Sequence, residues 1–188
     1  ATPKQMLNYG GDLARVTIEA QKQVNQIIKQ NLNKNFSSSA ELERFIFSIS
    51  SSYEGTVNSR PQIFRDWAFG FEDLRQSTLN LEVDWIWFIH WLLEELRNDY
   101  DPRILAAKVH FLLSVRLHPF YDGVGKTTRD LVDFIFMRKG FMPPNWSKVS
   151  MERYFREITT LQGTYDLIVD LEVRVFFANK CMEAILGF

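Results

Sequence analysis

The chain has 188 residues, of which 46% are hydrophobic and 24% charged, a balance typical of one folded globular domain. Its 22 basic and 23 acidic residues leave a formal net charge of −1, which excludes a global field that attracts nucleic acid or an anionic membrane. The single cysteine, Cys181, excludes an internal disulfide and a thiolate zinc cluster. With no secretory pattern at Ala1, we expect a cytoplasmic protein without nucleic acid or membrane as a partner.

Two amphipathic helices are predicted in the first third of the chain. Apolar residues recur at intervals of three and four over residues 12–32. A second helix is expected over about 39–54, because Ser38 and Glu41 have the spacing of a capping box and Gly55 can end the helix.

The rest of the chain also carries helical periodicity. We expect helices over about 83–96, 101–117, 126–139, 150–161 and 165–186. The segment between 55 and 80 is irregular, and alternating apolar residues leave a short β-hairpin over 75–83 open. The fold class is therefore all-α. We expect one domain over 1–188, with N-terminal helices over 1–55 and a core over 56–188.

One segment has residues that packing of a core does not explain: His118-Pro-Phe-Tyr-Asp-Gly-Val-Gly-Lys-Thr-Thr-Arg129. It joins two predicted helices. Gly123 and Gly125 allow the backbone to approach an anion closely, and the N–H groups at the start of the next helix favour a phosphate. Lys126 and Arg129, three residues apart, lie on one helix face. The segment therefore predicts an anion site.

Two other side chains of this loop suggest chemistry. His118 stands at its entrance, where a neutral imidazole can accept the proton of a hydroxyl group. Asp122 lies beside the predicted phosphate position, where a carboxylate is expected if a cation, most simply Mg²⁺, bridges it to the phosphates. Asp122 could instead cap the following helix.

The loop resembles the motif of the Fic family, H-x-F-x-[D/E]-G-N-G-R-x-x-R. It departs from that motif at Val124, where the family has asparagine, and at Lys126, where it has arginine. The resemblance extends from about Ser50 onward and includes a Gly-x-x-Pro-Pro-like turn at 140–144. The matching positions are His118, Phe120, Asp122, Gly123, Gly125 and Arg129, with the common proline at Pro119.

The resemblance implies a protein adenylyltransferase, which moves AMP from ATP to a Tyr, Ser or Thr hydroxyl of a target protein. His118 would be the base and Asp122 would hold Mg²⁺. Arg129 would reach the γ-phosphate, and Lys126 would replace the first arginine. The nucleotide would lie against Gly123, Val124, Gly125, Lys126 and Arg129.

A second pattern suggests regulation. One class of Fic proteins carries [S/T]-x-x-x-E-[G/N] on an inhibitory helix, and the segment from Ser50 to Gly55 fits it. The resemblance implies that Glu54 pairs with Arg129 and blocks the γ-phosphate. It also implies a hairpin flap that docks the target by strand addition, for which 75–83 is the candidate segment.

Other interpretations remain open. Valine at 124 cannot donate a side-chain hydrogen bond, so the chain could be a degenerate Fic-like module that binds nucleotide or a partner without catalysis. A P-loop is disfavoured, because that motif needs glycine where Phe120 stands and a strand before it. The target and a homo-oligomeric state are not determined by the sequence.

Overall fold

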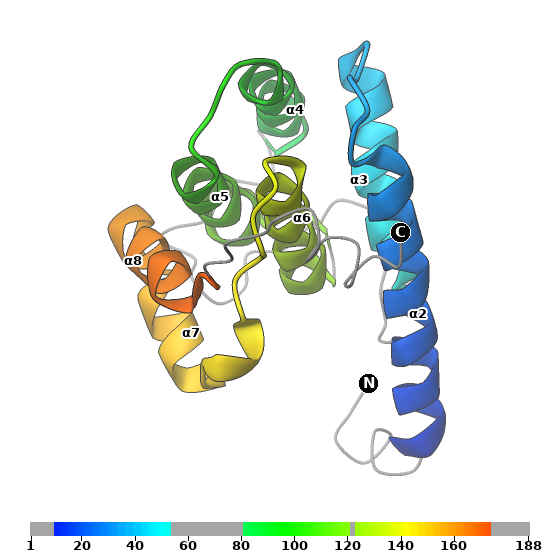
Figure 1. Ribbon diagram of the computed structural model, residues 1–188, viewed down its shortest axis with the longest axis vertical. Coiled ribbons are helices and arrows are strands. Elements are labelled where there is room, and N and C mark those ends of the chain that lie inside the picture. Colours follow the sequence, from blue (N-terminus) through cyan, green and yellow to red (C-terminus); the bar gives the residue numbers. More distant parts are fainter. Residues whose placement is uncertain (1–9, 54–80, 121–122, 174–188) are drawn as a thin grey trace.

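The computed structural model describes residues 10–53, 81–120 and 123–173. All secondary-structure elements in these ranges are helices (Figure 1), which confirms the all-α prediction. The elements are α2 (Gly10–Asn31), α3 (Ser39–Ser52), α4 (Leu81–Arg97), α5 (Pro102–His110), the π-helix η1 (Phe111–Leu117), α6 (Val124–Arg138), the 3₁₀-helix η2 (Trp146–Lys148), α7 (Met151–Glu157) and α8 (Leu161–Leu171).

Polar side chains begin the helices where the sequence predicts them. The Ser38 hydroxyl accepts a hydrogen bond from the Glu41 N–H at 3.2 Å and starts α3. The Asp101 carboxylate accepts from the Arg103 N–H at 2.9 Å, and Pro102 occupies the first turn of α5. These two boundaries therefore follow from local chemistry.

Several predicted boundaries are wrong. The helix expected over 165–186 is α8, which starts at Leu161 because Thr160 accepts from the Gly163 N–H at 3.0 Å, and which ends at Leu171. Residues 81–83, predicted to be extended, form the first turn of α4. The remainder of the expected hairpin, at 75–80, lies outside the described residues.

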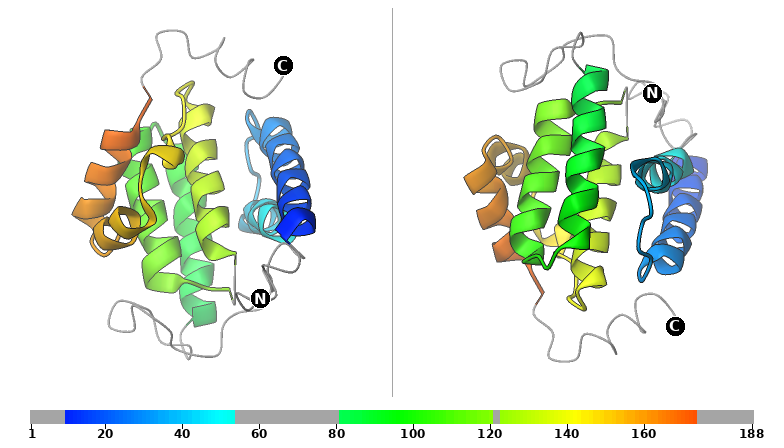
Figure 2. Two further views of the ribbon diagram at one scale, coloured as in Figure 1. Left: turned by 90° about the horizontal axis from the view of Figure 1, so that it is seen from below. Right: turned by 90° about the horizontal axis from the view of Figure 1, so that it is seen from above.

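The helices surround α6 (Figure 2). The pair α2 and α3 lies on one side of α6, and α5, α7 and α8 lie on the other. Helix α3 packs against α2, α4 and α6, and helix α5 packs against α6 and α8. Because α6 is central, side chains on its first turns face neighbours from both ends of the sequence.

Aromatic rings fill the core next to the motif loop. Phe120 is buried, and its ring centroid lies 5.5 Å from that of Trp85 on α4 and 5.9 Å from that of Phe47 on α3. Aromatic pairs at such distances add to the free energy gained by burial. Phe120 therefore anchors the loop that follows His118 to two helices.

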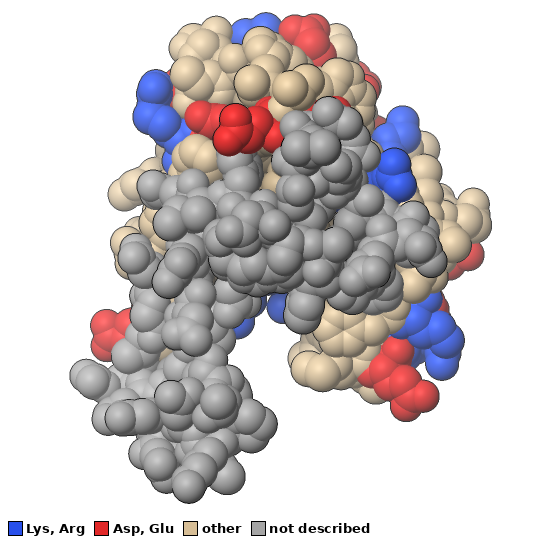
Figure 3. All heavy atoms as spheres, turned by 180° about the vertical axis from the view of Figure 1, so that it is seen from behind, with Lys and Arg blue, Asp and Glu red and all other residues tan. Residues whose placement is uncertain are grey.

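Acidic and basic side chains of the described residues are interspersed on the face in Figure 3, as expected for a net charge near zero. Among the helices of the described ranges, none combines the length and apolar character needed to cross a bilayer.

Candidate functional site

His118 comes directly after the π-helix η1, and the helical register there explains its orientation. The His118 N–H donates to the Leu113 carbonyl at 3.0 Å, five residues back, rather than to Ser114 as in an α-helix. In the same register Pro119 would donate to Ser114, but proline has no N–H. The Ser114 carbonyl instead accepts from Nδ1–H of the His118 ring at 2.7 Å.

This hydrogen bond sets the tautomer of His118. A carbonyl oxygen can only accept, so Nδ1 carries the proton, and in the neutral ring Nε2 holds the lone pair. The residue is half-buried and has a left-handed backbone, with φ 41° and ψ 60°. Positive φ is uncommon for a side-chain-bearing residue and concentrates at functional sites. In its neutral form, the His118 ring is therefore held in one tautomer.

The N-terminus of α6 comes after the loop. The helix begins at Val124, two residues earlier than predicted, after Gly123 in a left-handed conformation with φ 79°. A glycine at the N-cap has no side chain that could accept from the first N–H groups, which suits a helix end that binds an anion. Val124 itself is only 2% exposed and packs in the core, so it can offer a ligand only its backbone.

The two cations of the motif contact different helices. The Arg129 guanidinium donates from Nη1 to the Tyr154 hydroxyl on α7 at 3.3 Å and lies 5.4 Å from the centroid of that ring. The Lys126 ammonium lies 5.3 Å from the centroid of the Tyr53 ring, at the C-terminal end of α3. Arg129 also turns back over the first turn, since a Cβ on Gly125 would lie 3.3 Å from Nη1.

The end of α3 is bonded to α6 beside these cations. The hydroxyls of Ser50 and Thr127 are buried and 3.1 Å apart. The Tyr53 hydroxyl donates to the Asp130 carboxylate, and the side-chain oxygen of Gln21 on α2 lies 3.1 Å from the same hydroxyl. Ser50, predicted to belong to an inhibitory segment, is thus joined to the helix that carries Arg129.

Burial shifts the ionisation of the groups around α6. Loss of solvent raises the pKa of the Asp130 carboxyl to about 6, although the Tyr53 hydrogen bond opposes the shift. Burial beside Asp130 also raises the pKa of Tyr53. On α5, burial lowers the pKa of His110 to about 3, with the Arg129 charge as the second cause, so this imidazole is neutral at neutral pH.

Sequence reasoning missed the residues that support the predicted ones. Tyr154 contacts Arg129, and His110 lies behind Tyr154, with Nε2 2.7 Å from its hydroxyl. Nothing in the motif points to either residue, because Tyr154 lies 25 residues beyond Arg129. The role of Ser114 could have been found from the sequence, because Pro119 follows the histidine and, having no N–H, leaves a carbonyl near the helix end without a backbone partner.

Two predicted residues, Asp122 and Glu54, lie outside the described residues, so their metal-binding and inhibitory roles stay predictions. In the described ranges no group of three or more His, Cys, Asp or Glu side chains could hold a metal ion. A single carboxylate fits the donor chemistry of nucleotide-bound Mg²⁺, because that ion takes one or two carboxylates together with phosphate oxygens.

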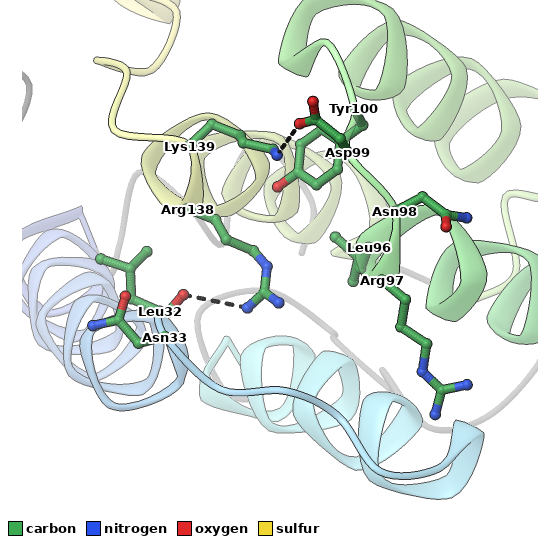
Figure 4. Close-up of a pocket in the computed structure, with 9 residues that line it drawn as sticks. All are labelled: Leu32, Asn33, Leu96, Arg97, Asn98, Asp99, Tyr100, Arg138 and Lys139. Atoms are coloured by element: carbon green, nitrogen blue, oxygen red, sulfur yellow. Dashed lines mark hydrogen bonds and ion pairs between the residues drawn. The ribbon is translucent and has the colours of Figure 1, made fainter.

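A cavity of about 400 Å³ lies at the opposite end of α6 (Figure 4). Arg138 and Lys139, which line it, bind neighbouring protein groups. Arg138 donates to the carbonyls of Leu32 and Lys34 at 3.3 and 2.6 Å, and Lys139 pairs with Asp99 at 2.7 Å. The helices α2, α4 and α6 all end here, so these cations face carbonyl ends with negative partial charge. The candidate site is therefore at the N-terminus of α6.

Known proteins resemble this chain in sequence and in fold. No family model matches the chain. A protein adenylyltransferase Fic from Drosophila grimshawi is 31% identical over 136 residues, 72% of this chain and 27% of the relative. The protein adenylyltransferase fic-1 of Caenorhabditis briggsae is 46% identical over 55 residues, 29% of this chain and 11% of the relative. The chain spans about a quarter or less of the length of these curated relatives.

Solved structures share the fold. Fic-1 from C. elegans superposes with a TM-score of 0.60 at 16% identity and covers 90% of this chain and 50% of its own. A Fic-domain-containing signaling protein from Bacteroides thetaiotaomicron gives a TM-score of 0.55 at 18% identity over 90% of this chain and 69% of its own. With the helical loop geometry around His118 and the sequence similarity to Fic adenylyltransferases, these likenesses lead to one conclusion: the chain carries a Fic (Fido) domain.

Proposed function

We propose that the chain transfers AMP from ATP to a hydroxyl side chain of a target protein. The hydrogen bond from His118 Nδ1 to the Ser114 carbonyl carries this proposal, because it leaves the ring's lone pair on Nε2. The target hydroxyl oxygen would attack the α-phosphorus while its proton moves to Nε2. The bond from the α-phosphorus to the bridging oxygen would break, and pyrophosphate would leave.

The N-terminus of α6 would bind the phosphates. Its first N–H groups come after a glycine cap, and Lys126 and Arg129 add two cations within the first two turns. Phosphoryl transfer needs little covalent help from protein, so placement and charge neutralisation would supply most of the rate. Asp122 would hold Mg²⁺, which would neutralise phosphate charge when bound.

We further propose that Glu54 inhibits the resting protein. The bonds from Ser50 to Thr127 and from Tyr53 to Asp130 fix the last turn of α3 against α6. The next residue is Glu54, and consecutive Cα atoms are about 3.8 Å apart. Glu54 therefore follows directly after a turn that is bonded to the helix carrying Arg129, which supports the proposal of an ion pair between Glu54 and Arg129.

The experiment that tests this function is the intact mass of the Glu54→Gly chain after incubation with ATP and Mg²⁺. We expect an AMP adduct on the chain itself or on an added target protein, more than in the natural sequence. Glu54→Gln, which keeps the side-chain length but removes the charge, should also raise the yield. His118→Ala in the Glu54→Gly background should abolish it.

A nucleotide-binding module without catalysis is the second candidate, and the burial of Val124 favours it. This side chain packs in the core and, being a hydrocarbon, has no group that could donate to a phosphate. One missing donor in a transition state costs roughly 3 to 4 kcal/mol. ATP binding by the Glu54→Gly chain, with no adduct on any target in a wide panel, would support this second candidate over the enzyme.

A further inference from the structure

Tyr154 on α7 stands between Arg129 of the motif and the buried His110 on α5. Its hydroxyl is 3.3 Å from Arg129 Nη1 and 2.7 Å from His110 Nε2. The rings of His110 and Tyr154 meet edge to face, with centroids 5.5 Å apart, and Trp146 meets Tyr154 at 6.3 Å in the same manner. Three residues from separate helices therefore fix the phenol in one orientation.

The direction of the hydrogen bonds favours Arg129. A guanidinium can only donate, so the Tyr154 oxygen accepts from it. His110 is fully buried and neutral, so it does not place a competing positive charge next to the guanidinium. The ring of Tyr154 also faces the cation, which adds a cation–π attraction.

On its other side, Arg129 is confined by the helix itself. A Cβ added to Gly125 would lie 3.3 Å from Nη1 and 3.9 Å from both Cζ and Nη2. The guanidinium thus lies between the first turn of α6 and the Tyr154 ring, which is the position in which it adds its charge to the N–H groups of the helix start.

We propose that Tyr154, supported by His110, is a positioning residue that holds the Arg129 guanidinium over the N-terminus of α6 for the terminal phosphate of a nucleoside triphosphate. This inference rests on the proposed function. It gives Arg129 a neutral partner that remains in place after Glu54 is displaced. The released cation is therefore already ordered when the triphosphate arrives, which lowers the entropic cost of binding.

The test compares ATP and ADP binding by calorimetry in the Glu54→Gly chain and in the same chain with Tyr154→Phe. The phenylalanine keeps the ring and removes the hydrogen bond. We expect ATP affinity to fall about tenfold and ADP affinity to stay unchanged, because only ATP carries the terminal phosphate. A general loss of packing would weaken both nucleotides alike, so the ratio of the two affinities separates positioning from structure.

Tyr100→Phe is the matched control. The Tyr100 hydroxyl donates to the Ile135 carbonyl at 3.1 Å near the far end of α6, so this variant also loses one phenol hydrogen bond to that helix. We expect it to lower stability without changing the ratio of ATP to ADP affinity.

A second readout needs no nucleotide. Phenylglyoxal modifies accessible guanidinium groups, and peptide mass spectrometry can follow Arg129 separately. Arg129 should react several times faster in Tyr154→Phe than in Tyr100→Phe, because it has lost a hydrogen-bond partner. His110→Phe should accelerate the reaction as well, since Tyr154 would lose its support.

The outcomes distinguish the two proposals. A Glu54→Gly chain that binds neither ATP nor ADP would overturn the proposed function and this inference together. A chain that binds ATP with the same preference over ADP after Tyr154→Phe would overturn the inference alone. Equal phenylglyoxal rates in the Tyr154 and Tyr100 variants would also overturn it.

Discussion

The hydroxyl groups of Ser50 and Thr127 lie 3.1 Å apart although 77 residues separate them, and both are buried where α3 meets α6. Neither group can turn to solvent. Replacing one of them leaves the other without this partner, whereas replacing both by apolar groups of similar size removes the conflict.

Ser50→Ala and Thr127→Val are therefore expected to cost about 1 to 3 kcal/mol each in the free energy of unfolding. The double variant should cost clearly less than the sum. Urea denaturation of the four proteins measures this coupling. Strictly additive changes would show that the two hydroxyls do not support each other across the contact between α3 and α6.

His118 is expected to be essential for chemistry and dispensable for folding when its backbone conformation is respected. Asparagine tolerates a left-handed backbone, and alanine does so less well. His118→Asn should therefore fold with nearly the natural stability, while His118→Ala loses about 1 kcal/mol. Both should lower AMP transfer by at least about 10²-fold, because a general base contributes roughly 10²- to 10⁴-fold.

Activity in the natural range for the asparagine variant would remove His118 from the reaction. Thermal unfolding of both variants is measured alongside the transfer assay, so that a loss of activity is not confused with a loss of structure.

Pro119→Ala tests the register argument. Alanine restores an N–H that, in the π-helical register of η1, would donate to the Ser114 carbonyl and compete with the His118 ring. We expect NMR of the imidazole nitrogens to show a mixture of tautomers in place of one with the proton on Nδ1. Transfer should fall severalfold. A single unchanged tautomer would mean that the proline does not set the orientation of the base.

Stability is expected to depend on pH through Asp130. Burial raises its pKa from 3.8 to about 6, so the folded chain binds this proton more tightly than the unfolded chain. The free energy of unfolding contributed by this group therefore falls as pH rises from about 4 to 6, by about 3 kcal/mol. Asp130→Asn keeps an oxygen for Tyr53 and cannot ionise, so it should be more stable than the natural chain at pH 7.

The two proteins should converge near pH 4, where Asp130 is protonated in the folded chain. Asp99→Asn is the control, because the Lys139 hydrogen bond lowers the pKa of this exposed carboxylate and its loss should leave the slope above pH 4 unchanged. A parallel pH profile for Asp130→Asn and the natural chain would contradict the shifted ionisation.

The helices could be predicted because apolar periodicity and capping residues act locally. Ser38 and Asp101 begin α3 and α5 as expected, since each needs only an N–H two or three residues away. The predicted start of α6 is too late, because Gly123 and Gly125 are typical of a loop and the sequence pattern therefore favours a start after both of them. Val124 in fact continues the buried stripe through Thr128, Leu131 and Ile135, a helical spacing already present in the sequence.

For the candidate site, the sequence predicts the residues of the motif but not their partners from other helices. The contact of Arg129 with Tyr154 depends on how α7 packs near α6, and no periodicity records that arrangement. Likewise, Lys126 and Arg129 share a helix face but contact rings on different neighbours, Tyr53 and Tyr154. Tertiary contacts of this kind appear only when the layers are assembled.

The wide turn of η1 makes the direction of the His118 side chain depend on the number of residues that precede it. A π-helix holds one more residue per hydrogen-bonded loop than an α-helix, and each residue added to or taken from a helix rotates the downstream residues by about 100°. Removing a single residue between Asp101 and His118 would therefore turn the imidazole in a different direction while leaving every letter of the motif intact. A relative that keeps the motif but has a shorter preceding helix would therefore have the same histidine with its side chain in a different direction.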